Sequence, residues 1–136
     1  MASEVFVDTS AFYAMLVRND EAHERACAYL HDSAKKKRLF VTSDYILDET
    51  FTLLRARKLN HLIEGLYNRI IKSEACTVVW TDQSMFHDAK AYFIKHSDKD
   101  WSFTDCHSFC VMKKRKIKNA LTKNHHFNQA GFKVIL

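Results

Sequence analysis

The sequence predicts a three-layer α/β/α sandwich built around a mostly parallel sheet of four to five strands. Short apolar segments alternate along the chain with longer segments whose apolar residues recur at helical spacing. Strands that alternate with helices are joined by right-handed crossovers, which produce a parallel sheet covered on both faces. The chain has only 2 glycines and no proline, whereas an all-β sandwich draws on many tight turns. Its 136 residues predict a single domain over residues 1–136.

Strand and helix signals alternate from the start of the chain. β-branched and aromatic runs mark strands, and Ser, Thr, Asp or Asn before an apolar run marks a helix start. In the first half these signals predict a strand at Glu4–Val7, a helix from Thr9 to about Arg18, a helix from Asn19–Asp20 to Lys35–Arg38, a strand at Leu39–Val41, a helix opened by Thr42–Ser43, and a helix over Leu59–Lys72. In the second half they predict a strand at Thr77–Trp80, a helix capped by Thr81–Asp82, a helix started by Thr104–Asp105, and strands at Asn119–Thr122 and Lys133–Leu136.

Charge is distributed unevenly along the chain. The formal net charge is +5, from 21 basic and 16 acidic residues, and no acid follows Asp105. A basic surface beside an acidic centre fits a polyanion, of which nucleic acid is the commonest. A solvated lysine-rich helix end accounts for the same charges and is favoured for a charge run taken alone. Seven basic residues follow the last acid, namely Lys113, Lys114, Arg115, Lys116, Lys118, Lys123 and Lys133.

Cysteine usage and the absence of a signal-peptide pattern predict a cytoplasmic protein with free, mostly buried thiols. No apolar run approaches the roughly 18 residues of a membrane span. Cys106 and Cys110 lie one helical turn apart beside His107, with His125–His126 further on, which is compatible with zinc. Core packing is favoured for both thiols, because they fall on the apolar side of a predicted helix.

Acidic side chains stand at the predicted edge of the sheet where the strands end. Asp8 follows the first strand directly, Asp105 starts a helix, and Glu49 lies about two turns into another helix. In open parallel sheets the ligand site lies beyond the carboxyl ends of the strands. Three converging carboxylates repel one another, and a hard divalent cation such as Mg²⁺ or Mn²⁺ relieves that repulsion. Each acid taken singly is equally compatible with a helix cap or a solvated side chain.

Four segments, in order along almost the whole chain, together resemble the PIN domain, a small metal-dependent ribonuclease fold. The resemblance extends in particular to the VapC-like toxin ribonucleases of VapBC toxin–antitoxin pairs. The matching strings are Val5–Phe12, then Thr42–Ser43 with Glu49–Thr50, then Trp101–Asp105 with Ser108–Phe109, and finally Ala120–Thr122 with His126–Phe127 and Ala130–Phe132.

The resemblance implies RNA cleavage at an acidic Mg²⁺ or Mn²⁺ site, frequent homodimers and an inhibitory antitoxin. Its acids correspond to Asp8, Glu49 and Asp105, which we expect to be both catalytic and metal-binding. Auxiliary roles are expected for Thr9, Ser10, Asp100, Ser102, Thr104 and Asn124. We expect RNA phosphates to contact Lys113, Lys114, Arg115, Lys116 and Lys123.

Asn124 departs from the family pattern, which has an aspartate at this place. An amide offers one neutral oxygen where a carboxylate offers two charged ones, so the site has formal charge −3 instead of −4. One Mg²⁺ should still bind, and Asn124→Asp should strengthen metal binding or cleavage. The alternative is a catalytically weak or inactive RNA-binding module on the same fold. A receiver-like phosphoacceptor at Asp8 ranks low, because that fold places its acceptor after a later strand.

Overall fold

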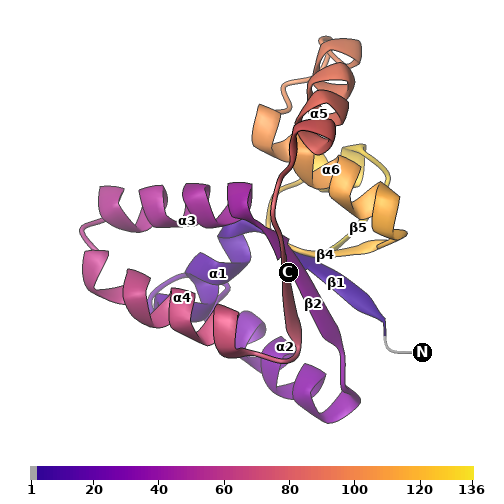
Figure 1. The fold of residues 1–136 in the computed structure, drawn as a ribbon. Helices are drawn as coiled ribbons and strands as arrows, with labels where there is room; N and C mark the ends of the chain where they lie inside the picture. The colour runs from indigo at the N-terminus through magenta and orange to yellow at the C-terminus, as the bar shows by residue number, and fades with distance from the viewer. Residues whose placement is uncertain (1–2) are drawn as a thin grey trace.

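Five parallel strands form one sheet in the structure, a computed structural model in which residues 3–136 are described (Figure 1). Their order across the sheet is β3–β2–β1–β4–β5, and every neighbouring pair is parallel. This confirms the predicted three-layer α/β/α class with a parallel sheet. The strands are β1 (Glu4–Val7), β2 (Leu39–Ser43), β3 (Cys76–Val79), β4 (Asn119–Leu121) and β5 (Lys133–Ile135).

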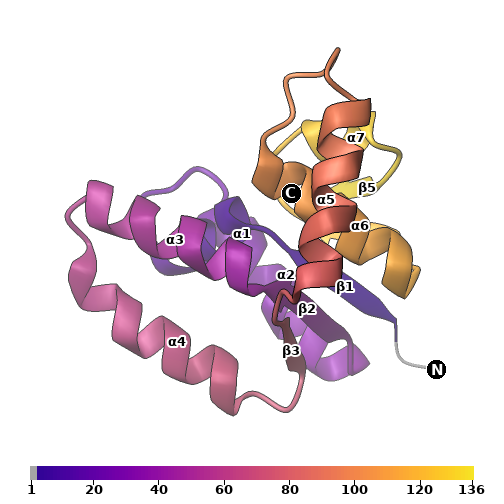
Figure 2. The same cartoon turned by 45° about the horizontal axis from the view of Figure 1, so that its top comes forward.

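Helices cover the two faces of the sheet, because the chain crosses it in both directions. Strands β1, β2 and β3 follow one another toward one edge, and the chain then returns to β4 on the other side of β1. Right-handed crossovers therefore place α1–α4 on one face and α5–α7 on the other, as Figures 1 and 2 show. The helices are α1 (Thr9–Leu16), α2 (His23–Lys36), α3 (Asp44–Ala56), α4 (Ile63–Lys72), α5 (Gln83–Lys95), α6 (Phe103–Arg115) and α7 (His126–Gln129), with a 3₁₀ turn η1 (Asn60–Leu62) before α4.

Strand β1 forms the centre of the core. It has a neighbour on each side and helices on both faces, so Val5, Phe6 and Val7 are almost completely buried. A fully buried parallel strand is apolar throughout rather than alternating, which is how this segment reads. Phe6 also packs against Phe127 of α7, which in turn meets Phe109 of α6 edge to face at 4.9 Å between ring centroids. These aromatic contacts thus pack α6 and α7 against the central strand.

Three helix starts differ from the sequence expectation for local reasons. Asp20 does not cap α2; its carboxylate accepts a hydrogen bond from the backbone of Ala22 and closes a turn before the helix begins at His23. Helix α6 is capped by Ser102, so Asp105 lies in its first turn instead of at the cap. Helix α7 was not among the elements predicted from sequence, because its four residues are too few to show helical periodicity.

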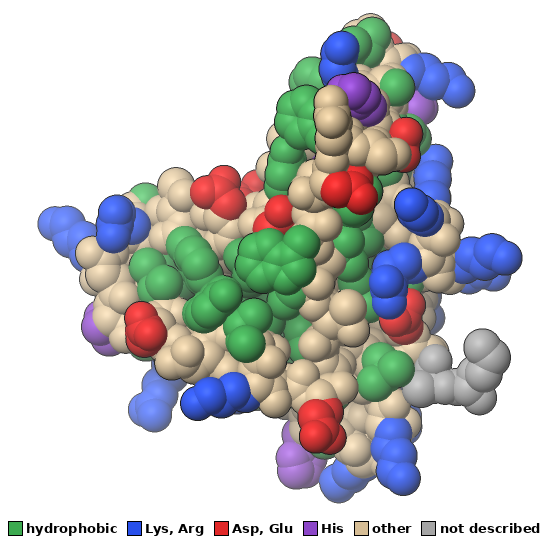
Figure 3. All heavy atoms as spheres, in the orientation of Figure 1, with side chains coloured by type: hydrophobic (Ala, Val, Ile, Leu, Met, Phe, Trp, Pro, Cys, Tyr) green, Lys and Arg blue, Asp and Glu red, His purple; other side chains and the backbone are tan. Residues whose placement is uncertain are grey.

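Exposed apolar side chains lie mainly around β3 and α5. Figure 3 shows hydrophobic side chains gathered between α3 and α4 and along α5. The most exposed of the large ones are Trp80 and Ile94, at 58% and 61% of their surface. Within residues 3–136 there is no helix with the length and apolar character needed to cross a membrane.

Candidate active site

Two of the predicted acids lie at the switch point of the sheet, where the strand order changes direction. Asp8 follows β1 directly, and its backbone N–H donates to the carbonyl of Leu121 at the end of β4 (3.1 Å). Asp105 lies in the first turn of α6. Crevices at such switch points, beyond the carboxyl ends of the strands, are the usual ligand sites of open α/β sheets. Asp8 and Asp105 are both buried, with 5% and 8% of their surface exposed.

The environment of Asp8 strongly disfavours its negative charge. The pKa of Asp8 is raised from 3.8 to about 6, and burial is the largest cause. A hydrogen bond from the Thr122 hydroxyl, 2.7 Å from Oδ2, acts in the opposite direction. The nearby charges of Glu49 and Asp105 contribute to the rise. Glu49 comes from the middle of α3, so three separate segments bring their carboxylates within electrostatic reach of one another.

Asp105 is held on both of its oxygens. Its Oδ2 accepts hydrogen bonds from the backbone N–H of Ser102 (3.2 Å) and from Nδ1 of His126 (2.8 Å). Its Oδ1 accepts one from the side-chain amide of Asn124 (3.1 Å). The Ser102 hydroxyl in turn accepts from the backbone of Asp105, which completes a capping box. Helix start and loop together therefore fix the direction of this carboxylate.

Thr122 links the two sides of the site. Its hydroxyl donates to Asp8, contacts the hydroxyl of Ser10 at 3.1 Å, and accepts from the backbone N–H of Asn124 (2.9 Å). Neither Thr122 nor His126 was expected as a site residue from the sequence. The pairing of β1 with β4 places Thr122 beside Asp8, and that pairing is not visible in the sequence pattern.

The auxiliary residues divide into those near the acids and those elsewhere. Ser10, Ser102 and Asn124 contact an acid, as expected. Thr9 contacts Asp8 only through its backbone, whose hydrogen bond lowers the pKa of that acid. The Thr9 hydroxyl lies 3.5 Å from the carbonyl of Ile46 and accepts from Thr50. The Thr9 side chain therefore joins α1 to α3. Within residues 3–136, no hydrogen bond joins the side chains of Asp100 or Thr104 to these acids.

The basic run extends away from the acids along α6, and the RNA contacts expected for it stay a prediction. Arg115 pairs with Glu4 at 2.9 Å. Glu4 starts β1, so this pair lies at the opposite end of that strand from Asp8. Lys113 donates to the hydroxyl of Tyr92. Because α6 begins at the site and runs away from it, Lys113 and Arg115 lie about 12 and 15 Å along the axis from Asp105. Figure 3 shows Lys and Arg side chains on the same side of the molecule as the start of β1.

The cysteines lie among packed side chains. Cys106 is buried in the hydrophobic core, which confirms that expectation, and burial raises the pKa of its thiol to about 11. The half-buried Cys110 lies 3.9 Å from the carbonyl of Asp88. Both are free thiols.

The donor set fits a hard divalent cation in its chemistry. Carboxylate oxygens are the ligands that Mg²⁺ and Mn²⁺ prefer. The pKa of Asp8 is raised mainly by burial and in smaller part by repulsion from Glu49 and Asp105, and a cation offsets both. Over residues 3–136, no three His, Cys, Asp or Glu side chains are grouped closely enough to ligate one ion. Asp105 instead satisfies its oxygens with the donors of Ser102, Asn124 and His126.

Comparison with known proteins identifies relatives of this chain over most of its length. The PIN domain pattern matches residues 5–133. The chain is 33% identical over 128 residues to the 23S rRNA-specific endonuclease VapC20 of Mycobacterium tuberculosis, covering 94% of this chain and 95% of that protein. It is 32% identical over 117 residues to a VapC ribonuclease of Archaeoglobus fulgidus, covering 82% and 72% of the two chains.

Solved structures show the same fold. The crystal structure of Mycobacterium tuberculosis VapC20, described as a sarcin–ricin loop cleaving toxin, superposes with a TM-score of 0.83 at 30% identity, over 94% of this chain and 95% of that one. FitAB bound to an IR36 DNA fragment gives a TM-score of 0.67 at 17% identity, over 96% and 92% of the chains, and shares the fold alone. On the family match and the relatives over almost its full length, this chain belongs to the PIN domain family.

Proposed function

We propose that this chain is a divalent-metal-dependent endoribonuclease that hydrolyses RNA phosphodiester bonds and acts as the toxin of a toxin–antitoxin pair. The observation that carries the proposal is the environment of Asp8. It is a buried carboxylate at the sheet switch point whose pKa is raised to about 6 by burial and by the charges of Glu49 and Asp105. Strongly perturbed acids in such a crevice are typical of catalytic sites. The similarity to VapC20 supports the choice of RNA as substrate.

In this proposal Asp8 and Asp105 hold Mg²⁺ or Mn²⁺, with Glu49 as the third acid. The bound ion supplies charge neutralisation at the phosphate and lowers the pKa of water. The side chains of the protein orient the acids. Thr122 and Ser10 direct Asp8, and Glu49 is suited to accept a hydrogen bond from the attacking water.

Asp105 is directed by a separate set of donors. Ser102, Asn124 and His126 hold its two oxygens. Because hydrogen bonds already orient these carboxylates, little further conformational entropy is lost when the metal and the RNA bind between them.

A catalytically inactive RNA-binding module is the second candidate, and Asn124 is the observation that favours it. Its amide donates to Asp105, where the family pattern has a fourth acid. The donated hydrogen bond gives Asn124 a structural role of its own, since it orients the carboxylate that the site needs. We therefore rank the active enzyme first. The homodimer implied by the family resemblance and the antitoxin partner are further proposals, which co-expression with a neighbouring small gene product and a solution mass measurement test.

Cleavage of RNA by the purified chain tests the function. We expect ribosomal RNA to be cut in the presence of Mg²⁺ or Mn²⁺ and to stay intact with a chelator. Asp8→Asn and Glu49→Gln should each abolish cleavage. Asp48→Asn is the matched control, because Asp48 is exposed and adjoins Glu49 in α3 without belonging to the site. Metal-independent binding without any cleavage would establish the second candidate, and cleavage that survives Asp8→Asn would refute the assigned site.

A further inference from the structure

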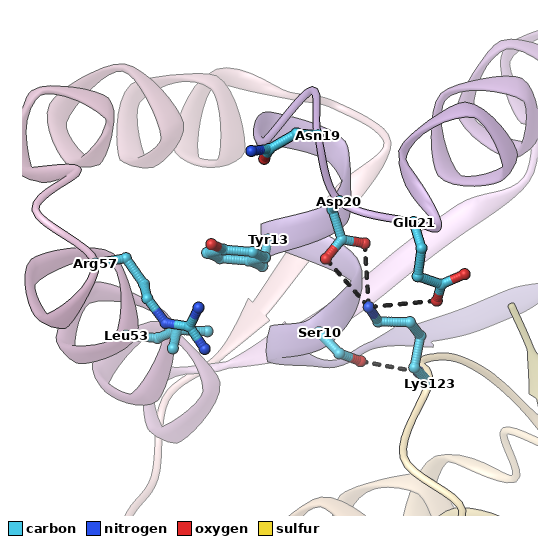
Figure 4. A pocket seen from close by; sticks show the side chains of 8 residues that line it. All are labelled: Ser10, Tyr13, Asn19, Asp20, Glu21, Leu53, Arg57 and Lys123. Atoms are coloured by element: carbon cyan, nitrogen blue, oxygen red, sulfur yellow. Dashed lines mark hydrogen bonds and ion pairs between the residues drawn. The ribbon is translucent and has the colours of Figure 1, made fainter.

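A polar cavity of about 430 Å³ opens beside the acidic site (Figure 4). Ser10 belongs to both: it lines the cavity, and its hydroxyl lies 3.5 Å from Oδ2 of Asp8. The backbone N–H of Lys123, the residue after Thr122, donates to the same hydroxyl (2.9 Å). The cavity is therefore joined directly to the loop that carries Thr122 and Asn124.

Two helices lead from the acids into the cavity. Glu49 and Leu53 on α3 and Arg57 at its C-cap follow one another at intervals of four residues and so share one face. Leu53 and Arg57 line the cavity, and Arg57 lies about 12 Å along the helix axis from Glu49. On α1, Tyr13 stands one turn beyond Ser10. A chain bound at the acids can thus continue along these two helices.

Arg57 and Tyr13 form the far wall of the cavity. The guanidinium of Arg57 lies over the Tyr13 ring, 5.8 Å from its centroid. Arg57 is exposed, and over residues 3–136 no carboxylate lies within 4 Å of its guanidinium. Figure 4 shows Tyr13 between Arg57 and the side chains of Asp20 and Lys123. An arginine with no acidic partner beside a half-buried aromatic ring is a pair suited to a nucleotide, since the cation takes phosphate and the ring stacks on a base.

Lys123 was expected to contact phosphate, but its charge is already matched. Its Nζ lies 3.1 Å from Oδ2 of Asp20 and 3.6 Å from Oε1 of Glu21. Its hydrogen bond is among the causes that lower the pKa of Asp20, so this acid stays ionised and keeps its partner. The positive charge that this side of the site offers a phosphate therefore comes from Arg57.

The charge balance of the site gives Arg57 its importance. Three acids with formal charge −3 repel an RNA strand, and the basic end of α6 lies toward the amino-terminal end of β1. A positively charged side chain along the path of the RNA offsets part of that repulsion. When it binds a phosphate, counterions condensed on the RNA are released.

We propose that this cavity is a subsite for the nucleotide that adjoins the scissile phosphate, in which Arg57 binds a phosphate and Tyr13 stacks on the base. The proposal rests on the proposed function for its substrate class. It assigns substrate binding to residues outside the acidic site, and no chemistry to Arg57 or Tyr13.

Binding measured in the absence of cleavage tests the subsite. The protein is the full chain carrying Asp8→Asn, and the probe is a short fluorescein-labelled single-stranded RNA of mixed sequence, followed by anisotropy at several salt concentrations. We expect Arg57→Gln to weaken binding on the order of tenfold and to reduce the salt slope by about 1. Tyr13→Leu should weaken binding by about fivefold or more at every salt concentration, whereas Tyr13→Phe should bind like the parent.

Arg55→Gln is the matched control, because it removes an exposed arginine from the last turn of α3 outside the cavity. Thermal melts establish that each variant is folded. Unchanged affinity and salt slope in folded Arg57→Gln and Tyr13→Leu proteins overturn the subsite. Equal losses in Arg57→Gln and Arg55→Gln overturn it too, because they show a non-specific charge effect.

Failure of the two proposals can be told apart. Cleavage by the wild-type chain combined with normal binding by both cavity variants rejects the subsite alone. Dependence of binding on Arg57 and Tyr13, with no cleavage by the wild-type chain, rejects the enzyme and keeps the cavity as an RNA-binding site.

Discussion

His126 donates a hydrogen bond from Nδ1 to Oδ2 of Asp105, at 2.8 Å. The backbone N–H of His126 also donates to the side-chain oxygen of Asn124, whose amide donates to the other oxygen of Asp105. The three residues therefore form a closed ring of hydrogen bonds. Such partners determine the direction of a ligand carboxylate, and their loss typically costs about 10- to 100-fold in metal affinity or activity.

We predict that His126→Ala lowers the rate of RNA cleavage by about tenfold or more, because Asp105 loses a directing donor. His126→Asn should restore part of the rate, since an amide nitrogen can approach the place of Nδ1. His125→Ala is the control, as that ring is exposed and adjoins His126 in sequence. A wild-type rate in His126→Ala, measured under single-turnover conditions, would show that Asp105 needs no support from this side chain.

Asp8→Asn should stabilise the fold at neutral pH while abolishing cleavage. The pKa of Asp8 is about 6 in the folded protein against 3.8 ordinarily, so the folded state binds this proton more tightly. Ionised Asp8 therefore costs stability that grows from pH 3.8 to 6 and stays constant above, at about 3 kcal/mol. The amide avoids this cost and can still accept the hydrogen bond from Thr122.

Melting temperatures of wild type and Asp8→Asn, measured at pH 4 and pH 8, check this. The variant should melt several degrees higher at pH 8 and near the wild type at pH 4. Burial lowers the pKa of His107, but this histidine is common to both proteins and cancels in the comparison. Addition of Mg²⁺ should raise the melting temperature of the wild type more than that of the variant. An equal difference at both pH values would contradict the ionisation argument.

Asn124→Asp should make the site more dependent on a divalent cation. A carboxylate at this position removes the donor to Asp105, now at 3.1 Å, and places two negative charges side by side. Without a cation we expect the variant to melt at a lower temperature than wild type; with Mg²⁺ or Mn²⁺ the loss should be recovered and the cation should bind more tightly. Calorimetric titration measures the affinity, and an unchanged cation affinity would refute the prediction.

Thr81→Val should destabilise the fold by about 1–3 kcal/mol. Thr81 donates its hydroxyl to Oδ1 of Asp44 (2.6 Å), and the same hydroxyl lies 2.8 Å from Nε2 of His107. Valine has the same shape and leaves the buried His107 without this partner. Urea unfolding measures the change, with Thr77→Val on the exposed side of β3 as the control. Equal stabilities of the two variants would show that this contact contributes nothing.

The order of the elements could be predicted from sequence, and the boundaries only in part. Strand β1 was predicted with its observed bounds, because Glu4 and the three apolar residues Val5–Val7 are followed directly by Asp8. The start of α2 was misplaced, because an Asp before a helix reads as a cap whether it bonds the first turn of the helix or closes a separate turn. Helix α7 is held by tertiary packing of Phe127, which leaves no periodic signal.

The sequence by itself determined the class of fold and the family and predicted three acids for the site, because hydrophobic periodicity, strand ends and ordered motifs are local properties of the chain. Only the tertiary structure decided which groups surround those acids. Thr122 contacts Asp8 across 114 residues of sequence, and His126 contacts Asp105 across 21. The basic end of α6 lies toward the amino-terminal end of β1. Contacts of this kind depend on strand order and helix direction, which arise when the whole chain packs around one core.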